Sequence, residues 1–234
     1  MKLITTSWDD GYPADIRLAE LLGKYGMKGT FYIPRNNEEH KVMNENEIYE
    51  LSKDFEIGGH TLNHKNLNKL NEKEIEYEVR GCFDWLKKML SSDPVSFCPP
   101  YGKYSNESYS MITRAGFKVI RTTELLSPYL KYNIVPTTLQ VFEHSRFTYL
   151  RHLLKRGNML YLALWAKSGF SIDIFRLLDH YMNYIELNGG CLHLWGHSWE
   201  IDEYGLWNKL ELIFKHISSQ EGFEYIKNMD LITH

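Results

Sequence analysis

The chain has 234 residues, of which 43% are apolar and 14% aromatic, enough for a packed core in one large domain or two small ones. A formal charge of -3 and a pI near 6.4 give no overall attraction to nucleic acid. The longest apolar run, residues 159–166, is shorter than the roughly 20 residues of a membrane-spanning helix, so no transmembrane segment is expected.

The first predicted elements alternate between strand and helix. Residues 4–6 are strand formers, residues 15–25 show helical spacing of apolar side chains, and residues 29–33 form a second strand that ends before Pro34. A strand, a helix and a strand in such close succession form a βαβ unit, which predicts a parallel sheet or barrel with right-handed crossovers.

The remaining elements continue this alternation. Helices are expected at residues 44–51, 71–90, 107–115 and 207–217, and over residues 145–182 with breaks at Gly157 and Gly169. Asn71 and Glu74 form a capping box ahead of the second of these helices. Strands are expected at residues 117–122, 135–142 and 191–197, with an extended stretch at 96–101 and a short last element at 222–228. Residues 56–59 lead into the next motif and are given no element type. No linker or repeat is visible, so residues 1–234 are interpreted as a single α/β domain.

Two adjacent carboxylates, Asp9 and Asp10, follow the first strand in the stretch I-T-T-S-W-D-D-G-Y. Because Gly11 breaks the strand, both should lie at its mouth, where the chain leaves the sheet. Neighbouring carboxylates repel each other, and a cation bound by one would offset this repulsion and keep the other ionised to handle a proton. An Asp-Asp-Gly run also makes an ordinary turn, and without further residues the turn is the commoner outcome.

Two pairs of histidines have the spacing H-x-x-x-H. On a helical turn His60 and His64 would lie on one face, close enough for both imidazoles to reach one ion at about 2.0 to 2.1 Å. The spacing is common, so the pair alone could equally serve packing or capping. His193 and His197 lie in a predicted strand, where four residues advance by roughly 13 Å, so they are not expected to chelate one ion together.

Four motifs taken together are more specific than any one of them. They are T-S-W-D-D-G near the start, H-T-L-N-H at residues 60–64, F-C-P-P-Y-G at residues 97–102, and H-S-W-E at the end of a late strand. From Asp9 to about Glu200, this combination resembles the polysaccharide deacetylase family, the NodB-homology carbohydrate esterases. The resemblance implies a distorted (β/α) barrel with a divalent metal at the carboxyl ends of its strands.

The resemblance also implies a role for each motif. The residues that match metal ligands are Asp10, His60 and His64. Asp9 matches the general base, and His197 matches the general acid. The residues that match the groove wall, whose backbone N–H helps to hold the oxyanion, are Pro99, Pro100 and Tyr101.

These roles agree with elementary chemistry. Two histidines and one carboxylate leave coordination positions open, as in a catalytic metal site. A bound ion would polarise the amide carbonyl and lower the pKa of water toward about 7, and Asp9 would take the proton. The departing amine needs a proton, which His197 would deliver as an imidazolium. Zinc is favoured for these ligands, although cobalt, nickel, manganese or iron would fit them too.

The third motif departs from the family pattern at Cys98. The family usually has an arginine there that pairs with the base aspartate, so its loss would weaken the orientation of Asp9. The later strand reads V-I-R-T-T and looks like a subgroup in which this strand supplies an arginine, so we expect Arg121 to replace the missing guanidinium. Cys98 as a nucleophile is the alternative, but the sequence offers it no obvious base, and a small buried thiol is the favoured interpretation.

Several other residues are candidates for supporting roles. His193 is interpreted as a core residue or as a hydrogen-bond partner of a metal ligand. Three carboxylates could hold the acid histidine or be solvated surface charges, namely Glu143, Glu200 and Asp202. Five aromatic residues could line a sugar groove, with core packing as the default, namely Trp8, Tyr12, Tyr101, Trp195 and Trp199.

Residues 146–170 combine cations with aromatic and aliphatic side chains. Amphipathic helices packed on the barrel are the favoured interpretation. The alternative is a peripheral patch for a lipid-linked or phosphorylated substrate, because cations beside Met159, Leu160, Tyr161 and Trp165 suit a membrane interface.

The sequence therefore favours a metal-dependent hydrolase that removes an acetyl, or else a formyl, group from an amino sugar. One alternative is a carbohydrate-binding protein on the same scaffold that has lost turnover, for which Cys98 is the evidence. Another is a hydrolase of a non-sugar amide or imide. Three scattered cysteines and a start without a secretory signal favour a cytoplasmic protein, with peripheral contact at the inner face of the membrane as an option. Such an address points to a glycan precursor as substrate.

Overall fold

The computed structural model describes residues 1–129 and 133–232, and its centre is a parallel β-sheet. The strands are β1 (Lys2–Asp9), β2 (Thr30–Ile33), β3 (Glu56–Gly59), β4 (Ser96–Phe97), β5 (Val119–Arg121), β6 (Ile134–Val135), β7 (Leu139–Gln140), β8 (Gly190–His197) and β9 (Glu224–Tyr225). The α/β class predicted from the βαβ pattern is confirmed.

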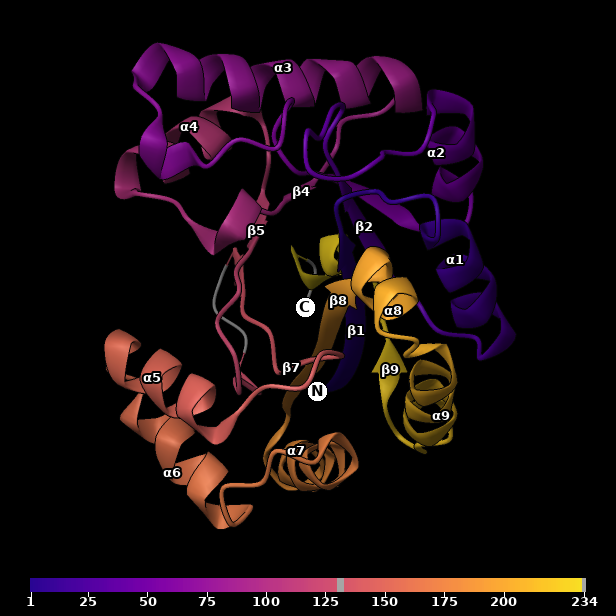
Figure 1. Cartoon of the computed structure of the whole chain (residues 1–234), viewed down its shortest axis with the longest axis vertical. Helices are drawn as coiled ribbons and strands as arrows, with labels where there is room; N and C mark the ends of the chain where they lie inside the picture. Colours follow the sequence, from indigo (N-terminus) through magenta and orange to yellow (C-terminus); the bar gives the residue numbers. More distant parts are fainter. Residues whose placement is uncertain (130–132, 233–234) are drawn as a thin grey trace.

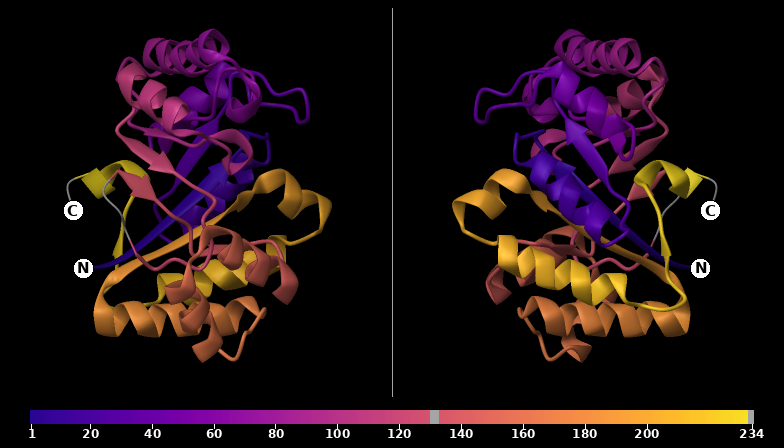
Figure 2. Two further views of the ribbon diagram at one scale, coloured as in Figure 1. Left: turned by 90° about the vertical axis from the view of Figure 1, so that its left-hand side faces the viewer. Right: turned by 90° about the vertical axis from the view of Figure 1, so that its right-hand side faces the viewer.

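The sheet curls into a distorted barrel. Its strand order is β6-β5-β4-β3-β2-β1-β8-β7, and β9 pairs with β1. The edge strands β6 and β7 are consecutive in the chain and are separated only by residues 136–138, so the two edges of the sheet are held near each other. The long strands β1 and β8 lie side by side (Figure 2), in a register that runs from Lys2 opposite Gly190 to Asp9 opposite His197.

Helices connect the strands and surround the sheet (Figure 1). The α-helices are α1 (Asp15–Lys24), α2 (Glu45–Ser52), α3 (Glu72–Leu90), α4 (Asn106–Ala115), α5 (Arg146–Arg156), α6 (Met159–Lys167), α7 (Ile174–Asn188), α8 (Ser198–Glu203) and α9 (Trp207–Ser218). The predicted capping box of α3 is present, because Asn71 and Glu74 bond each other's backbone N–H groups at 2.8 and 3.2 Å. The predicted breaks at Gly157 and Gly169 separate α5, α6 and α7.

Strand β1 runs through the middle of the core, and every residue from Leu3 to Asp9 is buried. Polar side chains on this strand are tolerated because they find partners. The hydroxyl of Ser7, for example, lies 2.8 Å from Nε2 of His193, whose Nδ1 lies 3.0 Å from the carbonyl of Pro136. Burial lowers the pKa of His193 to about 3, so the ring is neutral and donates to that carbonyl. His193 is therefore a core residue.

Two expectations were wrong. The strand expected at residues 135–142 is divided into β6 and β7. Pro136 has no backbone N–H, and the N–H groups of the two threonines after it point away from β5. The N–H of Thr137 bonds Glu124 at 2.8 Å, and that of Thr138 bonds His193 at 2.9 Å. This crossing carries the chain from one edge of the sheet to the other. In addition, α8 was not expected.

Candidate active site

The carboxyl ends of the parallel strands bring the polar motif residues together. Asp9 is the last residue of β1, Arg121 of β5 and His197 of β8, and His60 follows β3 directly. Because all of these strands run in one direction, their ends meet on one face of the barrel, where parallel barrels place their sites.

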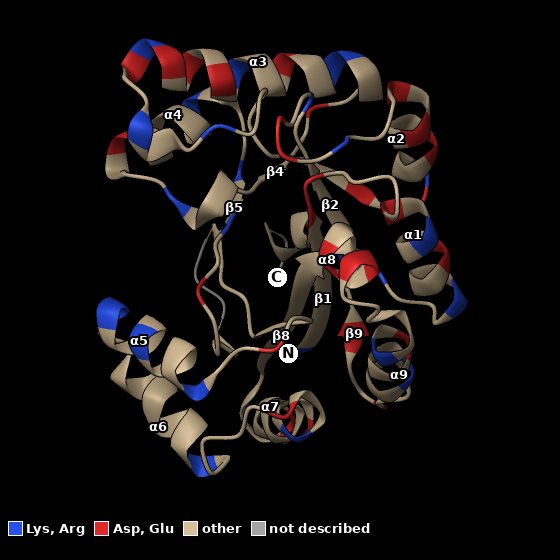
Figure 3. Ribbon diagram, in the orientation of Figure 1, with Lys and Arg blue, Asp and Glu red and all other residues tan. Residues whose placement is uncertain are grey.

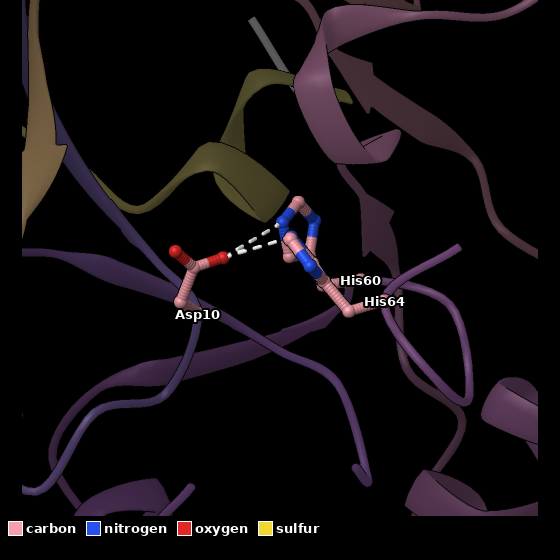
Figure 4. A group of neighbouring side chains, drawn as sticks. All are labelled: Asp10, His60 and His64. Carbon is pink, nitrogen blue, oxygen red and sulfur yellow. Dashed lines mark ion pairs between the residues drawn. The ribbon is translucent and has the colours of Figure 1, made fainter. Parts of the chain in front are cut away.

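Asp10, His60 and His64 form a compact, buried group at this face (Figure 4). Their potential ligand atoms all lie within 4.8 Å of one another. Oδ1 of Asp10 lies 3.4 Å from Nε2 of His60 and 3.1 Å from Nε2 of His64. Two imidazole nitrogens and one carboxylate oxygen therefore point at a common centre.

The loop after β3 positions the two histidines, not the helical turn expected from their spacing. Thr61 and His64 have positive φ angles of 60° and 52°, which fold the loop tightly. Asp10 is also left-handed, with a φ of 79°. Non-glycine residues in this region carry backbone strain and concentrate at functional sites. The three ligands thus depend on strained backbone, which a helical pattern does not predict.

The donor chemistry of this group fits a divalent cation. Nδ1 of His60 lies 2.6 Å from the carbonyl of Cys98, which can only accept, so Nδ1 carries the proton. Nε2 of His60 therefore faces the carboxylate of Asp10, and a proton or a cation must lie between them. A ring oriented by a carbonyl on its other nitrogen is typical of metal-ligating histidines.

The carboxylate of Asp10 is fixed from its other side by Trp199. The indole Nε1 donates to Oδ2 at 2.8 Å, and the indole ring stacks on His40 with centroids 4.2 Å apart. Burial alone would raise the pKa of Asp10, but hydrogen bonds from His60 and His64 outweigh it and hold this pKa well below its ordinary value. Asp10 is therefore an ionised carboxylate held in a fixed orientation.

Asp9 is contacted on both carboxyl oxygens by residues at the ends of β4 and β5, two strands that do not pair with β1. The guanidinium of Arg121 donates to Oδ1, and the thiol of Cys98 lies 3.9 Å from Oδ2. Burial raises the pKa of the Cys98 thiol, so it is protonated and cannot serve as a thiolate nucleophile at neutral pH. The contact expected between Arg121 and Asp9 is thus present.

Arg121 is fully buried between two aromatic rings. Its guanidinium carbon lies 4.8 Å from the ring centroid of Trp195 and 5.2 Å from that of Tyr32. Burial opposes the charge, yet the carboxylate of Asp9 holds the pKa of Arg121 above its ordinary value. The pair is a buried ion pair, in which loss of one partner would strand the other.

His197 of β8 lies beside Asp9, its register partner on the adjacent strand β1, and is held by Glu200. Its Nδ1 lies 2.6 Å from Oε2 of Glu200 on the first turn of α8. Burial lowers the pKa of His197, but the bond to Glu200 and the nearby charges of Asp10 and Asp9 raise it above its ordinary value overall. The imidazolium is therefore favoured, with Nε2 left to act in the cleft.

Of the three carboxylates considered for holding His197, two are engaged elsewhere. Asp202 accepts from the indole of Trp207 at 2.9 Å, and Glu143 pairs with Lys209. Two further hydrogen bonds behind Glu200 could not be predicted from residue spacing. Nε2 of Gln140 donates to Glu200 at 3.1 Å, and the amide oxygen of Gln140 lies 2.8 Å from Nε2 of His144.

The site opens into a cleft of about 470 Å³. Tyr101 stands on its rim with a φ of 58°, and its hydroxyl donates to Glu39 at 2.8 Å. Of the aromatic candidates, Tyr101, Trp195 and Trp199 line the cleft, whereas Trp8 is core. Pro100 is buried at the start of the turn that carries Tyr101.

One buried acid near the site was not singled out from the sequence. Asp15, the first residue of α1, is fully buried, and neither of its carboxyl oxygens has a hydrogen-bond partner among the described residues. Burial raises the pKa of Asp15 well above its ordinary value, and the charges of Asp10 and Asp9 add to this rise, although Ser198 and His197 oppose it. Burial therefore favours the protonated form of Asp15 in the folded protein.

This fold and this site define a metal-site α/β barrel, and comparison with known proteins identifies its family. The profile of the polysaccharide deacetylase family matches residues 1–120, just over half of the chain. The chain belongs to the polysaccharide deacetylase family, and it carries the Asp-His-His group as a buried site that suits a divalent metal.

Individual relatives are distant. A peptidoglycan-N-acetylglucosamine deacetylase of Bacillus cereus is 24% identical over 126 residues, which cover 50% of this chain and 43% of that protein. The chain spans less than half the length of the curated relatives that it matches.

Solved structures share the fold across almost the whole chain. The Xyl-CE4 domain of a multidomain xylanase from the hindgut metagenome of Trinervitermes trinervoides has a TM-score of 0.60 at 16% identity, covering 99% of this chain and 90% of that domain. The chitin deacetylase of Colletotrichum lindemuthianum has a TM-score of 0.59 at 16% identity, covering 96% of this chain and 84% of that one. The expected distorted barrel is confirmed.

Proposed function

We propose that this protein is a metal-dependent hydrolase that removes an N-acetyl, or an N-formyl, group from an amino sugar in a glycan or glycan precursor. The observation that carries the proposal is the pairing of two neighbouring carboxylates with different partners. Asp10 faces two imidazoles, whereas Asp9 is bonded by a guanidinium. One carboxylate is thereby suited to a metal and the other to a proton.

A bound divalent ion would polarise the amide carbonyl and favour ionisation of the attacking water. The residues that would hold it are Asp10, His60 and His64. Two nitrogens and one oxygen favour zinc, and cobalt, nickel, manganese or iron fit the same donors.

Asp9 would accept the proton of the attacking water as general base. Arg121 keeps this carboxylate oriented through one oxygen, and the thiol of Cys98 approaches the other. A general base must be correctly oriented as well as ionised, because proton transfer requires it to lie within hydrogen-bond distance of the reacting water. The contacts from Arg121 and Cys98 fix the orientation of Asp9.

His197 would protonate the leaving amine as general acid. Glu200 accepts from its Nδ1, which fixes the ring orientation and leaves Nε2 as the donor toward the substrate. On the rim, the backbone N–H of Tyr101, set by the turn of Pro99 and Pro100, would stabilise the oxyanion. The exposed ring of Tyr101 would stack on a sugar ring, and Trp199 lines the same cleft.

The test is release of acid from defined sugars. Metal-loaded protein is incubated with a panel of N-acetylated and N-formylated amino sugars and with non-sugar amides and imides, and free acetate and formate are measured. We expect release from amino sugars that Asp9→Asn abolishes. Because this change leaves the buried guanidinium of Arg121 without its carboxylate, the variant should be less stable, and circular dichroism checks that it is folded at the assay temperature. Asp202→Asn, at a carboxylate on α8 that bonds Trp207 instead, is the matched control and should retain release.

The alternatives make different predictions in the same experiment. A carbohydrate-binding protein would bind the sugars in calorimetry without releasing acid. A hydrolase of another class would release acid from the non-sugar amides or imides alone. The evidence for lost turnover was the missing arginine at Cys98, and the guanidinium of Arg121 at Asp9 counts against it. The cytoplasmic address stays a prediction.

A further inference from the structure

The helical hairpin formed by α5 and α6 differs in charge from the rest of the chain. Residues 144–172 contain no Asp or Glu, although the whole chain has a formal charge of -3. Within this segment lie the cations Arg146, Arg151, Lys155, Arg156 and Lys167. In Figure 3 the hairpin carries blue segments without red, whereas α3 carries both colours. On α3, for example, Arg80 pairs with Asp84.

The same hairpin exposes large apolar side chains beside its cations. On α5 the exposed apolar side chains are Phe147, Leu150 and Leu154. The exposed fraction is 71% for Phe147 and 54% for Leu154. The spacing of the three side chains, three and then four residues, places them on one face of the helix. Met159 and Leu160 extend the exposed apolar surface at the start of α6.

The opposite face of α5 is already used by the fold. Tyr149 and Leu153 are buried in the core, so the helix does not need its exposed face for packing within the chain. Arg146 ties the start of the hairpin to its end, because its Nε donates to the carbonyl of Phe170 at 3.0 Å. The helix is thus held in place by its buried face, and its other face remains exposed to solvent.

Cations set around an apolar face are the features that bind an anionic bilayer. The apolar side chains enter the boundary of the acyl chains, and Lys and Arg are attracted to the negative surface. A second copy of this chain would bring like charges together on this face, which opposes self-association. None of the described helices is both long and apolar enough to cross a bilayer, so any attachment by them would be peripheral.

The hairpin also forms a wall of the cleft. Thr148 and His152 of α5 line it, opposite Asp9 and Asp10. Nε2 of His152 accepts from the backbone N–H of Leu125 at 3.3 Å, which joins α5 to the segment after β5. A surface that met α5 from outside would therefore lie next to the cleft that holds the candidate catalytic residues.

We propose that α5 and α6 dock on an anionic membrane surface and hold the cleft beside a substrate carried on a membrane lipid. The docking surface is defined by Phe147, Leu150, Arg151, Leu154, Lys155, Arg156, Met159 and Leu160. The docking itself does not require the hydrolase activity, whereas the lipid-carried substrate rests on the proposed function.

The first test measures the part played by charge. Wild-type protein is floated with vesicles of phosphatidylcholine alone and of phosphatidylcholine with an equal amount of phosphatidylglycerol. The variant Arg151→Gln/Lys155→Gln/Arg156→Gln should bind the anionic vesicles more weakly by about fivefold for each cation, roughly a hundredfold in all. The matched control removes three exposed lysines of α3, as Lys73→Gln/Lys87→Gln/Lys88→Gln, and should bind like wild type.

The second test measures the part played by the apolar face. The variant Phe147→Ser/Leu154→Ser keeps every charge and should lose at least tenfold in vesicle binding. Its matched control is Tyr77→Ser/Leu187→Ser, which removes two large exposed side chains from α3 and α7. All four positions are on the surface, so the variants should fold like wild type.

The outcomes separate docking from catalysis. Asp9→Asn should float like wild type, because it leaves the hairpin unchanged. Absence of flotation with anionic vesicles, or an equal loss in the α3 control, would overturn the docking surface. Self-association in sedimentation that disappears in Phe147→Ser/Leu154→Ser, without vesicle binding, would assign the face to a second copy. An acidic protein captured by the hairpin in place of vesicles would also overturn the proposal.

The substrate part has its own measurement. An N-acetylated amino sugar is presented free in solution and attached to a lipid in the anionic vesicles. The charge variant should turn over the free sugar like wild type and the vesicle-bound sugar at least tenfold more slowly. Equal rates for both would overturn the lipid-carried substrate, whereas no release from either substrate would contradict the proposed function and leave the flotation result standing.

Discussion

The two sides of the cleft hold their ionisable groups in different ways. On the side formed by β1, β3 and β5, Asp9, Asp10 and His60 are at most 4% exposed and are enclosed by protein partners. On the side formed by β7, β8 and α8, the side chains of His197 and Glu200 keep 18% and 15% of their surface. The side chains of the first group are almost fully enclosed, whereas those of the second are more open to solvent in the cleft.

This difference follows the chemistry proposed for each side. Groups that hold a cation and orient a base must keep fixed charges, which burial and mutual pairing enforce. A group that donates a proton in every turnover must be reprotonated, and partial exposure allows that exchange. Changes on the buried side should therefore abolish function or fold, whereas changes on the open side should tune it.

The largest expected effect comes from removing a donor on the buried side. His64→Ala should lower affinity for a divalent metal by at least a hundredfold and turnover by at least about a thousandfold, because the loss of metal chemistry is worth several kcal/mol. Metal affinity is measured by competition with a chromophoric chelator. His144→Ala, at a histidine that lines the same cleft outside the ligand group, should keep its metal. Equal metal loss in both variants would contradict the assignment.

The next largest effect tests the buried ion pair between Arg121 and Asp9. Arg121→Ala leaves the carboxylate of Asp9 buried without its guanidinium, which should lower the free energy of unfolding by about 3 to 5 kcal/mol and reduce turnover. Chemical denaturation and acid release measure the two effects. Cys98→Arg in the Arg121→Ala background restores a guanidinium at the position where the family usually has an arginine. The thiol of Cys98 lies 3.9 Å from Asp9, so an arginine there should recover part of the lost stability and part of the lost turnover. Unchanged turnover in Arg121→Ala would show that Arg121 does not replace the family arginine.

The buried side was also the more predictable from sequence. Asp9 and Asp10 stand next to a breaker at the end of a predicted strand, so the local pattern places them at its mouth. The family resemblance added His60 and His64 to the same end of the barrel. Arg121 required the resemblance to a subgroup, because a strand end alone does not say which carboxylate its side chain will reach. Only the conformation of the histidine loop was wrong, since left-handed Thr61 and His64 leave no sign in residue spacing.

The open side depends on contacts between distant segments and was predicted less well. Glu200 was one of three candidates for holding His197, and nothing in the sequence ranked it above Asp202. Gln140 reaches Glu200 because the chain crosses between the two sheet edges after Pro136, where one continuous strand was expected. Closure of a barrel is a global property, so its consequences are not visible in local periodicity.

A smaller effect should follow on the open side when Glu200 is neutralised. Glu200 raises the pKa of His197, and a general acid is active below its pKa and inactive above it. Glu200→Gln should therefore move the alkaline limb of kcat/KM to lower pH and reduce activity at neutral pH by about tenfold to a hundredfold. The pH profile is compared with that of Glu143→Gln, whose carboxylate pairs with Lys209 instead. An alkaline limb unmoved in Glu200→Gln would exclude His197 as the group that titrates there.

The smallest effect concerns Asp15, whose pKa depends on burial, on Asp10 and Asp9 on one side and on His197 on the other. Because its pKa in the folded protein is raised above the unfolded value, the folded state binds the extra proton, and stability falls as pH rises from about 4 toward the folded pKa. Asp15→Asn removes this titration while keeping a neutral group of similar shape. The free energy of unfolding of wild type should therefore fall with pH more steeply than that of the variant, by up to about 1.4 kcal/mol per pH unit.

Urea denaturation of both proteins at a series of pH values measures these slopes, and the metal-loaded state is kept constant throughout. Asp84→Asn, at an exposed carboxylate of α3 that pairs with Arg80, is the matched control for loss of an acid. Parallel stability curves for wild type and Asp15→Asn would mean that Asp15 is ionised in the folded protein. In that case the buried side would carry one more negative charge than its partners balance, and the contrast between the two sides would rest on exposure alone.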